Sequence, residues 1–252
     1  MAGLRDIGDQ GVTIAAGGYA ILMQLANPAV AAGVARHSDF VNRPTDRLWS
    51  TLAYIYVTLY GTDEQRRAIV GSVNRAHGPV HSDEPGGYSA FDPNLQLWVA
   101  ATLCTAGVRM HELVYGPLSS EDGDRVFRDY GELAAALQMP AESWPGDRRG
   151  FETWWDHQLP LLEVGDEARA VARQIFHPTR APLWLRAALP AARLISVGLL
   201  TEELRAAYGF DWSPRHQRRF ETALRRTRRL WPILPAGLRT LPMRRLLARA
   251  PG

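Results

Sequence analysis

An arginine and a threonine stand four residues apart in an otherwise apolar stretch of the first third of the chain. Arg47 and Thr51 fall within 44–60, which we predict to be a helix, and this spacing places both side chains on one helical face. A buried guanidinium needs a partner such as a carboxylate, a propionate or bound oxygen. The alternative is a purely structural one, in which Arg47 pairs with a local acid such as Asp46 or Asp39.

A histidine closes the next predicted helix, over 63–77. His77 is followed by Gly78 and Pro79, a sequence that ends a helix and leaves the histidine in its last turn. A histidine at that position is also favoured simply by the helix dipole. His81 follows at the spacing found in zinc-binding helices, but Pro79 lies between the two residues. We therefore do not expect His77 and His81 to share a helical face or a zinc ion.

Three further groups could do chemistry, and each has a plainer interpretation. Cys104 lies in an apolar helical run, which favours a buried, inert thiol over a thiolate ligand. His111 and Glu112 could form an acid–base pair, but we expect a surface pair. His37 lies close to Asp39 in the sequence and could either line a pocket or cap the chain locally.

The composition limits the chemistry further. All 29 basic residues are arginine, which excludes Walker phosphate loops and lysine-dependent mechanisms such as Schiff-base catalysis. The single cysteine excludes an intrachain disulfide and a multi-cysteine zinc site, and no Cys-x-x-Cys-His sequence is present for covalent haem. A chain of 252 residues, 46% of them hydrophobic, is large enough to enclose an internal ligand cavity.

Helices must position these candidate residues, because helical patterning runs through almost the whole sequence. Helix-start signals recur at Thr62, Asp92, Ser119 and Ser213. We predict helices over 12–26, 29–37, 44–60, 63–77, 93–115, 120–137, 148–162, 166–177, 190–207, 214–230 and 235–248. No joint is long enough to be a convincing domain linker. We expect an all-α fold, with residues 1–252 forming a single globular domain of about ten helices.

The charge is distributed unevenly along the chain. The segment from Arg215 to Arg249 carries eleven arginines and one acid, Glu221, whereas the preceding residues are acidic overall. A basic helical end over 213–252 on an acidic body is not typical of a nucleic-acid binder, and we expect no nucleic-acid partner. For the arginine helix itself the open interpretations are peripheral contact with an anionic membrane, nucleic-acid binding, or a solvated face that pairs with the acidic body.

The N-terminal region does not have the pattern of a signal peptide. The segment from Met1 to Asp9 contains two acids and one arginine, unlike the positively charged start of a signal. Residues 10–35 are uncharged, but the best apolar piece, from Ile14 to Ala26, is too short to span a bilayer. We interpret it as a buried core helix. We expect a cytoplasmic protein, which could also contact a membrane peripherally.

Several short motifs occur in an order and spacing that carry a family resemblance. The motif sequence is Pro28-Ala29-Val30-Ala31-Ala32-Gly33-Val34, His37-Ser38, Arg47-Leu48, Thr51, Tyr54, His77-x-x-Val80, Tyr88-x-Ala90-x-Asp92-Pro93, Trp98-Val99, Leu199-Leu200, Leu204-Arg205, Tyr208-Gly209-Phe210-Asp211-Trp212, Leu234-Pro235, Leu238-Arg239 and Pro242. Together they resemble the MpaB-type oxygenase family, which includes the latex-clearing rubber oxygenases. The resemblance runs from about residue 12 to residue 248.

The resemblance implies an all-α fold around a non-covalent haem b. His77 matches the histidine that ligates the iron in the latex-clearing members, and Arg47 and Thr51 match an arginine and a threonine beside the haem. The chemistry that it implies is dioxygen-dependent attack on carbon–carbon double bonds of isoprenoid chains. Apolar walls for such a substrate would come from Leu48, Trp49, Leu52 and Trp98.

The sequence departs from the family pattern at positions that matter for mechanism. Rubber oxygenases carry a glutamate upstream of the arginine and a lysine just before the threonine, but here the first glutamate is Glu64 and Ser50 takes the place of the lysine. Asp39 is the nearest acid that could substitute for the missing carboxylate. Ser82 stands where many relatives have glycine, and Ala100 where many have histidine. These differences indicate a substrate other than rubber.

The residues and the resemblance together predict a haem-b-dependent oxygenase that acts with dioxygen on a hydrophobic, unsaturated isoprenoid, lipid or secondary metabolite. In this prediction His77 binds the iron, Arg47, Thr51 and Trp98 contact the haem, and Arg47, Thr51 and Asp39 serve catalysis. The alternative is a non-catalytic haem-binding module or gas sensor.

Overall fold

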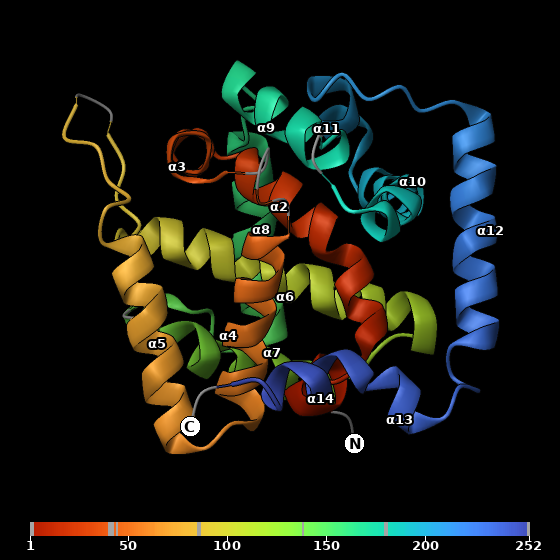
Figure 1. The fold of residues 1–252 in the computed structure, drawn as a ribbon, viewed down its shortest axis with the longest axis horizontal. Coiled ribbons are helices and arrows are strands. Elements are labelled where there is room, and N and C mark those ends of the chain that lie inside the picture. The colour runs from red at the N-terminus through yellow and green to blue at the C-terminus, as the bar shows by residue number, and fades with distance from the viewer. Residues whose placement is uncertain are drawn as a thin grey trace.

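The long helix α6 (Pro93–Tyr115) runs through the middle of the protein and separates two parts of the apolar core (Figure 1). We describe a computed structural model over residues 3–39, 43, 45–84, 87–137, 139–178 and 181–250. Trp98, Met110 and Val114 of α6 belong to one cluster, and Leu97 and Cys104 to the other. A helix that is apolar on most of its circumference is buried on most of its circumference.

The regular elements found in the described residues are helical. In chain order they are α1 (Leu4–Gly8), the 3-10 helix η1 (Gly11–Ala16), α2 (Gly17–Leu25), α3 (Pro28–His37), α4 (Asp46–Tyr60), α5 (Asp63–His77), α6, α7 (Ser120–Ala135), η2 (Ala141–Ser143), α8 (Arg148–Gln158), η3 (Leu159–Leu161), α9 (Asp166–Phe176), α10 (Leu183–Gly198), α11 (Glu202–Ala207), α12 (Pro214–Leu230), α13 (Ala236–Arg239) and α14 (Leu241–Leu247). An isolated bridge pairs His81 with Ser89. The prediction of an all-α domain is therefore confirmed.

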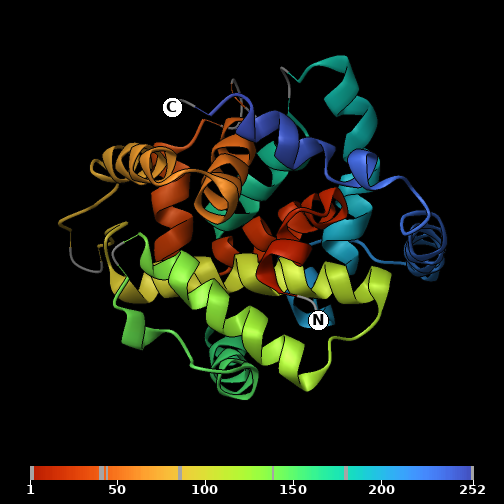
Figure 2. The ribbon, with the colours of Figure 1, turned by 90° about the horizontal axis from the view of Figure 1, so that it is seen from below.

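The two core clusters draw on different helices. The first joins α2, α3, α9 and the segment after α10 to one side of α6, and the second joins α1, α4, α7 and α8 to the other side. Figures 1 and 2 place α5 at one edge of the molecule and α12 at the opposite edge. Helix α14 packs back against α4, so the C-terminal region covers part of the helix that carries Arg47 and Thr51.

The predicted helix starts are borne out by side-chain caps. Thr62 and Gln65 form a reciprocal capping box, and the side chains of Asp92, Ser119 and Ser213 accept hydrogen bonds from the first turns of α6, α7 and α12. These caps satisfy backbone N–H groups that have no partner within the helix. They fix where α5 and α6 begin, and hence the register of the residues that both helices present to the interior.

Several predicted helix boundaries were wrong. The segment 12–26 begins as the 3-10 helix η1, and the short helix α1 was not predicted. The segment 190–207 is two helices, because the Thr201 hydroxyl accepts from the N–H of Leu204 and starts α11. Helix α10 also begins at Leu183 and tolerates Pro190 inside it. The segment 235–248 divides at Thr240, just before a proline in the first turn of α14.

Among the described residues, no single helix is both long enough and apolar enough to cross a membrane. The bent pair Gly11–Leu25 and Pro28–His37, which meet at 111°, satisfies the length and composition test only when taken together.

Candidate functional site

A cavity of about 770 Å³ lies between α3, α4, α5 and α6, with α7 closing one side. Arg47 and Thr51 line it from α4, and His77 lines it from the last turn of α5. We call this space the Arg47 cavity. Its size falls within the range typical of small-molecule and cofactor sites. The structure therefore brings together the three residues that the sequence singled out.

Arg47 is half-buried and has a neutral partner. Its Nη2 donates to Oε1 of Gln24 at 3.2 Å, and burial lowers the pKa of the guanidinium. In the described part of the chain no carboxylate lies within 4.0 Å of Arg47, and Asp46 instead pairs with Arg43 at 2.5 Å. The structural alternative of a local ion pair with Asp46 is therefore wrong. A desolvated cation that has only a neutral acceptor favours an anionic ligand.

Gln24 is held in position by a chain of hydrogen bonds that reaches from α2 to α6. Its Nε2 donates to Oγ1 of Thr102 at 3.1 Å, and Thr102 Oγ1 donates to the carbonyl of Val99 at 2.7 Å. This network determines the orientation of the Gln24 amide. The Thr102 hydroxyl donates its one proton to the carbonyl of Val99, so toward Gln24 it can only accept a hydrogen bond. The amide oxygen of Gln24 is thereby directed at Arg47.

Gln24 and Thr102 are functional candidates that the sequence reasoning missed. Both side chains are almost completely buried, at 4% and 0% exposure. The available signal was a single glutamine in the apolar run from Ile14 to Ala26, since a buried amide must find hydrogen-bond partners. The partner itself, 78 positions away, could not be read from local spacing.

His77 reaches the cavity as a neutral imidazole. Burial lowers its pKa first, and the positive charge of Arg47 lowers it further. Its Nδ1 is buried and makes no hydrogen bond within the described residues, and its ring packs edge-on against Phe91 with the centroids 6.3 Å apart. A neutral imidazole is the form that ligates a metal. His81 lies beyond the end of α5, outside the cavity lining, with its Nδ1 3.2 Å from the Gly78 carbonyl oxygen.

The remaining predicted site residues are divided between cavity and core. Asp39 and His37 line the Arg47 cavity, as do Trp49 and Ser50. Trp98 does not. Its ring stacks on Trp155 of α8 with the centroids 5.2 Å apart, within the apolar core. The prediction that Trp98 contacts a cofactor is therefore corrected.

The physical reason for this correction is the helical turn of about 100° per residue, which directs Val99 and Ala100 to the cavity and Trp98 away from it. Leu48 and Leu52, which were also expected to form its walls, do not line the cavity either.

Other candidate groups lie apart from the cavity. Cys104 is fully buried, and burial raises the pKa of its thiol well above the ordinary value, as expected of an inert cysteine. His111 is buried against Tyr115, so the prediction of a surface pair was wrong for it. Glu112 accepts from Arg148 at 3.0 Å and from the N–H of Leu118. Neither His111 nor Glu112 lines the Arg47 cavity.

Fold and site together define an all-helical protein with a largely apolar cavity in which, among the described residues, Arg47 has no carboxylate partner and His77 presents a neutral imidazole. Residues 4–230 match the family described as "ER-bound oxygenase mpaB/B'/Rubber oxygenase, catalytic domain", and the chain belongs to this family. The family is one of oxygenases.

Two curated relatives are also similar to the chain. They are uncharacterized protein Mb2261 of Mycobacterium bovis and uncharacterized protein Rv2237 of Mycobacterium tuberculosis. Each is 38% identical over 211 residues, which cover 81% of this chain and 83% of the relative. No solved structure matches the chain.

Proposed function

We propose that the protein is a haem-b-dependent oxygenase that uses dioxygen to oxidise a hydrophobic, unsaturated small molecule. The observation that carries the proposal is the juxtaposition of neutral His77 and cationic Arg47 in one cavity, where Arg47 has no carboxylate partner among the described residues. Membership of the oxygenase family supports the reaction class.

The residues of the Arg47 cavity fit a haem. His77 would hold the iron through a ring nitrogen, and Arg47 would neutralise a propionate or the negative charge that develops on reduced oxygen. The buried hydroxyls of Tyr88 and Tyr130 also line the cavity and lack hydrogen-bond partners among the described residues. Buried polar groups without protein partners are typical of a wall that meets a ligand. Haem, when bound, supplies the oxidative chemistry, and the chain supplies binding, orientation and polarity.

The other lining side chains suggest how a substrate is handled. Thr51 stands one helical turn after Arg47 and can donate a hydrogen bond to the same bound group. Asp39 lines the cavity and is the acid that we assign to proton transfer. The walls contributed by Val34, Val99 and Leu103 are apolar, which suits an isoprenoid or lipid chain.

The iron-ligand assignment is tested by the absorption spectrum of protein purified after haem-supplemented expression. We expect a Soret band in the wild type that is lost or shifted in His77→Ala and retained in the matched variant His81→Ala. A colourless wild-type protein that cannot be reconstituted with haem would overturn the proposal. Equal spectra for His77→Ala and the wild type would overturn the ligand assignment alone.

Catalysis is tested separately from haem binding. Oxygen consumption that depends on an unsaturated lipid or terpenoid would identify an oxygenase, whereas a haem protein that consumes no oxygen with any such substrate would be the non-catalytic module or gas sensor. We expect Arg47→Gln to lower the rate of oxygen consumption by about one to two orders of magnitude through loss of charge stabilisation. An unchanged rate of oxygen consumption in Arg47→Gln would show that Arg47 has no part in the reaction.

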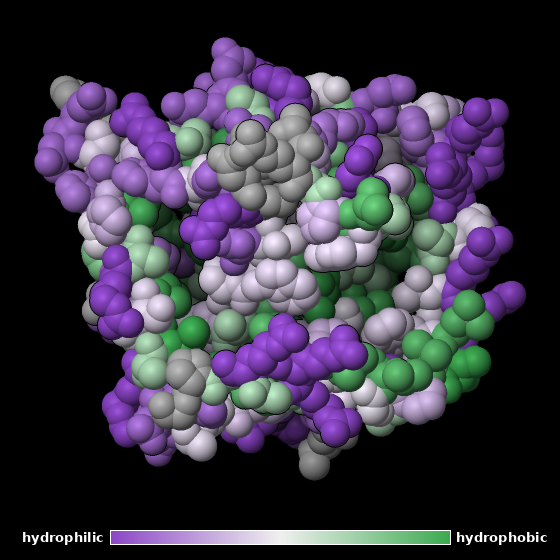
Figure 3. All heavy atoms as spheres, in the orientation of Figure 1, coloured by the Kyte–Doolittle hydropathy of each residue, from purple (hydrophilic) through white to green (hydrophobic). Residues whose placement is uncertain are grey.

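We also propose that the C-terminal region contacts an anionic membrane surface, from which a hydrophobic substrate could be taken up. The exposed apolar residues Leu230, Ile233, Leu234 and Leu238 follow the exposed arginines Arg228 and Arg229 in the chain. Figure 3 shows this apolar surface at the lower end of α12. The ion pair found for an α12 arginine in the described residues is internal, between Arg225 and Glu221 at 3.9 Å, so the predicted pairing with the acidic body is not seen.

Apolar residues beside arginines are typical of interfacial membrane contacts. Co-sedimentation with phosphatidylserine vesicles should therefore fall in Ile233→Glu and weaken with salt. Binding that neither the substitution nor salt affects would refute the contact.

A further inference from the structure

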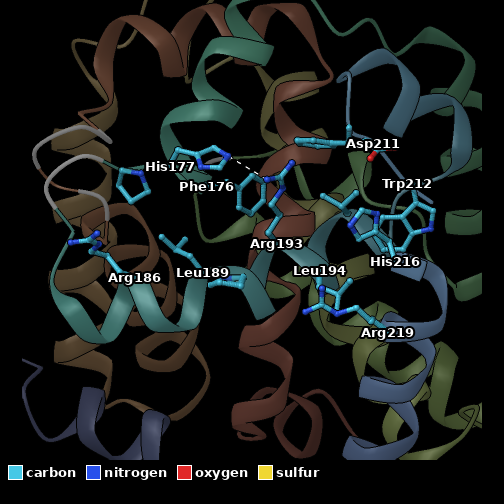
Figure 4. Close-up of a pocket in the computed structure, with 14 residues that line it drawn as sticks. Phe176, His177, Arg186, Leu189, Arg193, Leu194, Asp211, Trp212, His216 and Arg219 are labelled. Carbon is cyan, nitrogen blue, oxygen red and sulfur yellow. Dashed lines mark hydrogen bonds between the residues drawn. The ribbon is translucent and has the colours of Figure 1, made fainter. Parts of the chain in front are cut away.

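A second pocket, of about 860 Å³, lies beside α10 and is entirely separate from the Arg47 cavity. Its walls come from α10, the end of α9, the segment before α12 and the first turns of α12 (Figure 4). We call it the α10 pocket. No residue lines both spaces. Nothing in the proposed oxygenase chemistry uses the α10 pocket, so it requires its own explanation.

The α10 pocket carries more positive than negative charge. Arg186, Arg193 and Arg219 line it, with Asp211 as the acid of the set. No carboxylate lies within 4.0 Å of any of these three arginines in the described part of the chain. Cationic side chains gathered around a pocket without acidic partners are the arrangement that binds oxyanions.

Arg193 is the arginine most firmly placed in the wall. It is half-buried, its guanidinium lies over the ring of Phe210 at 5.8 Å, and its Nη1 is 3.3 Å from Nε2 of His177. Figure 4 shows this contact as a dashed line across one side of the pocket. Because a guanidinium can only donate, Nε2 of His177 is the acceptor in this contact. The remaining donors of Arg193 have no partner among the described residues.

His216 adds a hydrogen-bond donor from α12. Its Nδ1 accepts from the backbone N–H of Ser213 at 3.2 Å, as part of the cap that starts α12. The tautomer that accepts at Nδ1 carries its proton on Nε2, so this nitrogen is a donor with no partner in the described residues. This cap hydrogen bond thus fixes the orientation of the His216 ring, which α12 presents to the pocket.

The rest of the wall is apolar and aromatic. Phe176 is buried, Trp212 is half-buried, and Leu189, Leu194 and Val197 line the side formed by α10. Trp212 Nε1 donates to Gln217 at 2.9 Å, so the indole offers the pocket its ring and not its N–H group. A flat or branched apolar body would pack against these groups.

The two helices that form the pocket are held together closely. A Cβ on Gly198 would stand 2.4 Å from Cδ2 of Phe220, so the backbone of α10 meets an aromatic ring of α12 at a distance that only glycine permits. This contact fixes α12 against α10 beside the pocket. The helix backbones that carry Arg193 and His216 are therefore held at a fixed spacing, which lowers the entropic cost of binding.

We propose that the α10 pocket binds an amphipathic organic anion, with a carboxylate or phosphate head group held by Arg193, Arg219 and His216 and an aromatic or branched apolar body packed against Trp212 and Leu189. The proposal is independent of haem binding and of oxygenase activity.

The experiment is calorimetric titration of the full chain with 2-naphthoate, 2-naphthyl phosphate, inorganic phosphate and 2-naphthalenemethanol. We expect one of the two naphthyl anions to bind at one site per chain, and the other probes to bind at least about tenfold more weakly. The tighter anion identifies the head group as carboxylate or phosphate. If the uncharged alcohol or inorganic phosphate binds as tightly as both naphthyl anions, the pocket does not recognise an amphipathic anion.

Substitutions test whether the anion binds in the α10 pocket. Arg193→Gln should raise the Kd of the tighter anion about tenfold or more, because a charge-assisted pair of hydrogen bonds is lost. Arg226→Gln, which removes an exposed α12 arginine outside the pocket, and Arg47→Gln in the other cavity should leave Kd unchanged. Loss of binding in Arg47→Gln with retention in Arg193→Gln would assign the anion to the Arg47 cavity and overturn the proposal.

A second variant covers the case in which Arg193→Gln does not fold. Leu189 is partly exposed on α10, so Leu189→Glu is tolerable for folding and places a carboxylate in the pocket. Repulsion should abolish binding of the anion while the circular dichroism melting curve stays close to that of the wild type. Unchanged binding in a folded Leu189→Glu protein would also overturn the proposal.

Discussion

The guanidinium of Arg47 and the side-chain amide of Gln24 meet at 3.2 Å, across the boundary between α4 and α2. This contact joins the helix that carries the predicted site to a buried network ending at Thr102 and Val99 on α6. Gln24 is a positioning residue in this arrangement. It holds the Arg47 side chain at the cavity while leaving its charge uncompensated.

The first prediction concerns this network. Gln24→Leu should lower the free energy of unfolding by about 1–3 kcal/mol, because Arg47 loses its acceptor and Thr102 loses a donor. Urea unfolding measures the change. Thr102→Val provides the comparison, and the double variant should cost less than the sum of the two single variants because they share one network. Strict additivity would show that Gln24 and Thr102 are not coupled.

The second prediction concerns the charge of His77. In protein free of haem, histidine NMR should give a midpoint below 6.5 for His77, and Arg47→Gln should move it upward because the nearby positive charge is removed. Arg67→Gln, on the exposed side of α5, is the matched control. If the midpoint of His77 does not change in Arg47→Gln, the charge of Arg47 does not act on His77.

The lowered pKa of His77 also determines the direction in which pH changes the stability of the folded protein. Unfolded His77 gains a proton around its ordinary pKa of 6.5, whereas the folded residue gains one only at lower pH. The unfolded state therefore binds more protons between the two values, and the contribution of His77 to stability falls as pH falls through that window. Above it the contribution is constant.

The third prediction concerns two glycines in different surroundings. A Cβ on Gly18 would stand 2.1 Å from Oγ of Ser196, because α2 and α10 pack closely there, whereas a Cβ on Gly107 would have no atom within 4 Å. Gly18→Ala should cost about 1–3 kcal/mol of stability through overpacking. Gly107→Ala should stabilise α6 by about 0.4–1 kcal/mol. Thermal melts of both variants measure the two effects. Equal effects would contradict the difference in packing around Gly18 and Gly107.

The fourth prediction concerns Cys104. Its side chain is fully buried in α6 and its thiol pKa is raised by burial, so a thiol reagent should modify it only when the protein opens. The reaction rate should rise with urea in step with unfolding. Rapid modification of the native protein would show that this part of the core is accessible.

Much of the fold followed from local signals, because capping residues and apolar periodicity act over a few positions. Thr62, Asp92 and Ser213 each begin the helix that was predicted from them. The break at Thr201 was missed because the apolar pattern was followed across it, although Thr201 followed by Glu202 and Glu203 is itself a helix-start signal.

The site was partly predictable for a similar reason. The spacing of Arg47 and Thr51 placed both on one face of α4, and the end signals after His77 placed it in the last turn of α5. Trp98 was assigned to the wrong side of α6, because an apolar helix gives no polar face from which to orient it. Gln24 depended on a contact between distant helices, and periodicity carries no information about that.

The packing of α14 on α4 has a consequence for how the protein is made. Roughly 180 residues separate these two helices, so at ordinary translation rates α14 leaves the ribosome on the order of ten to forty seconds after α4. By then α5, α6 and α7, which supply the other walls of the Arg47 cavity, have already emerged. There is thus an interval in which the cavity can form while one side of α4 is still bare, and a cofactor can be loaded before α14 is in place.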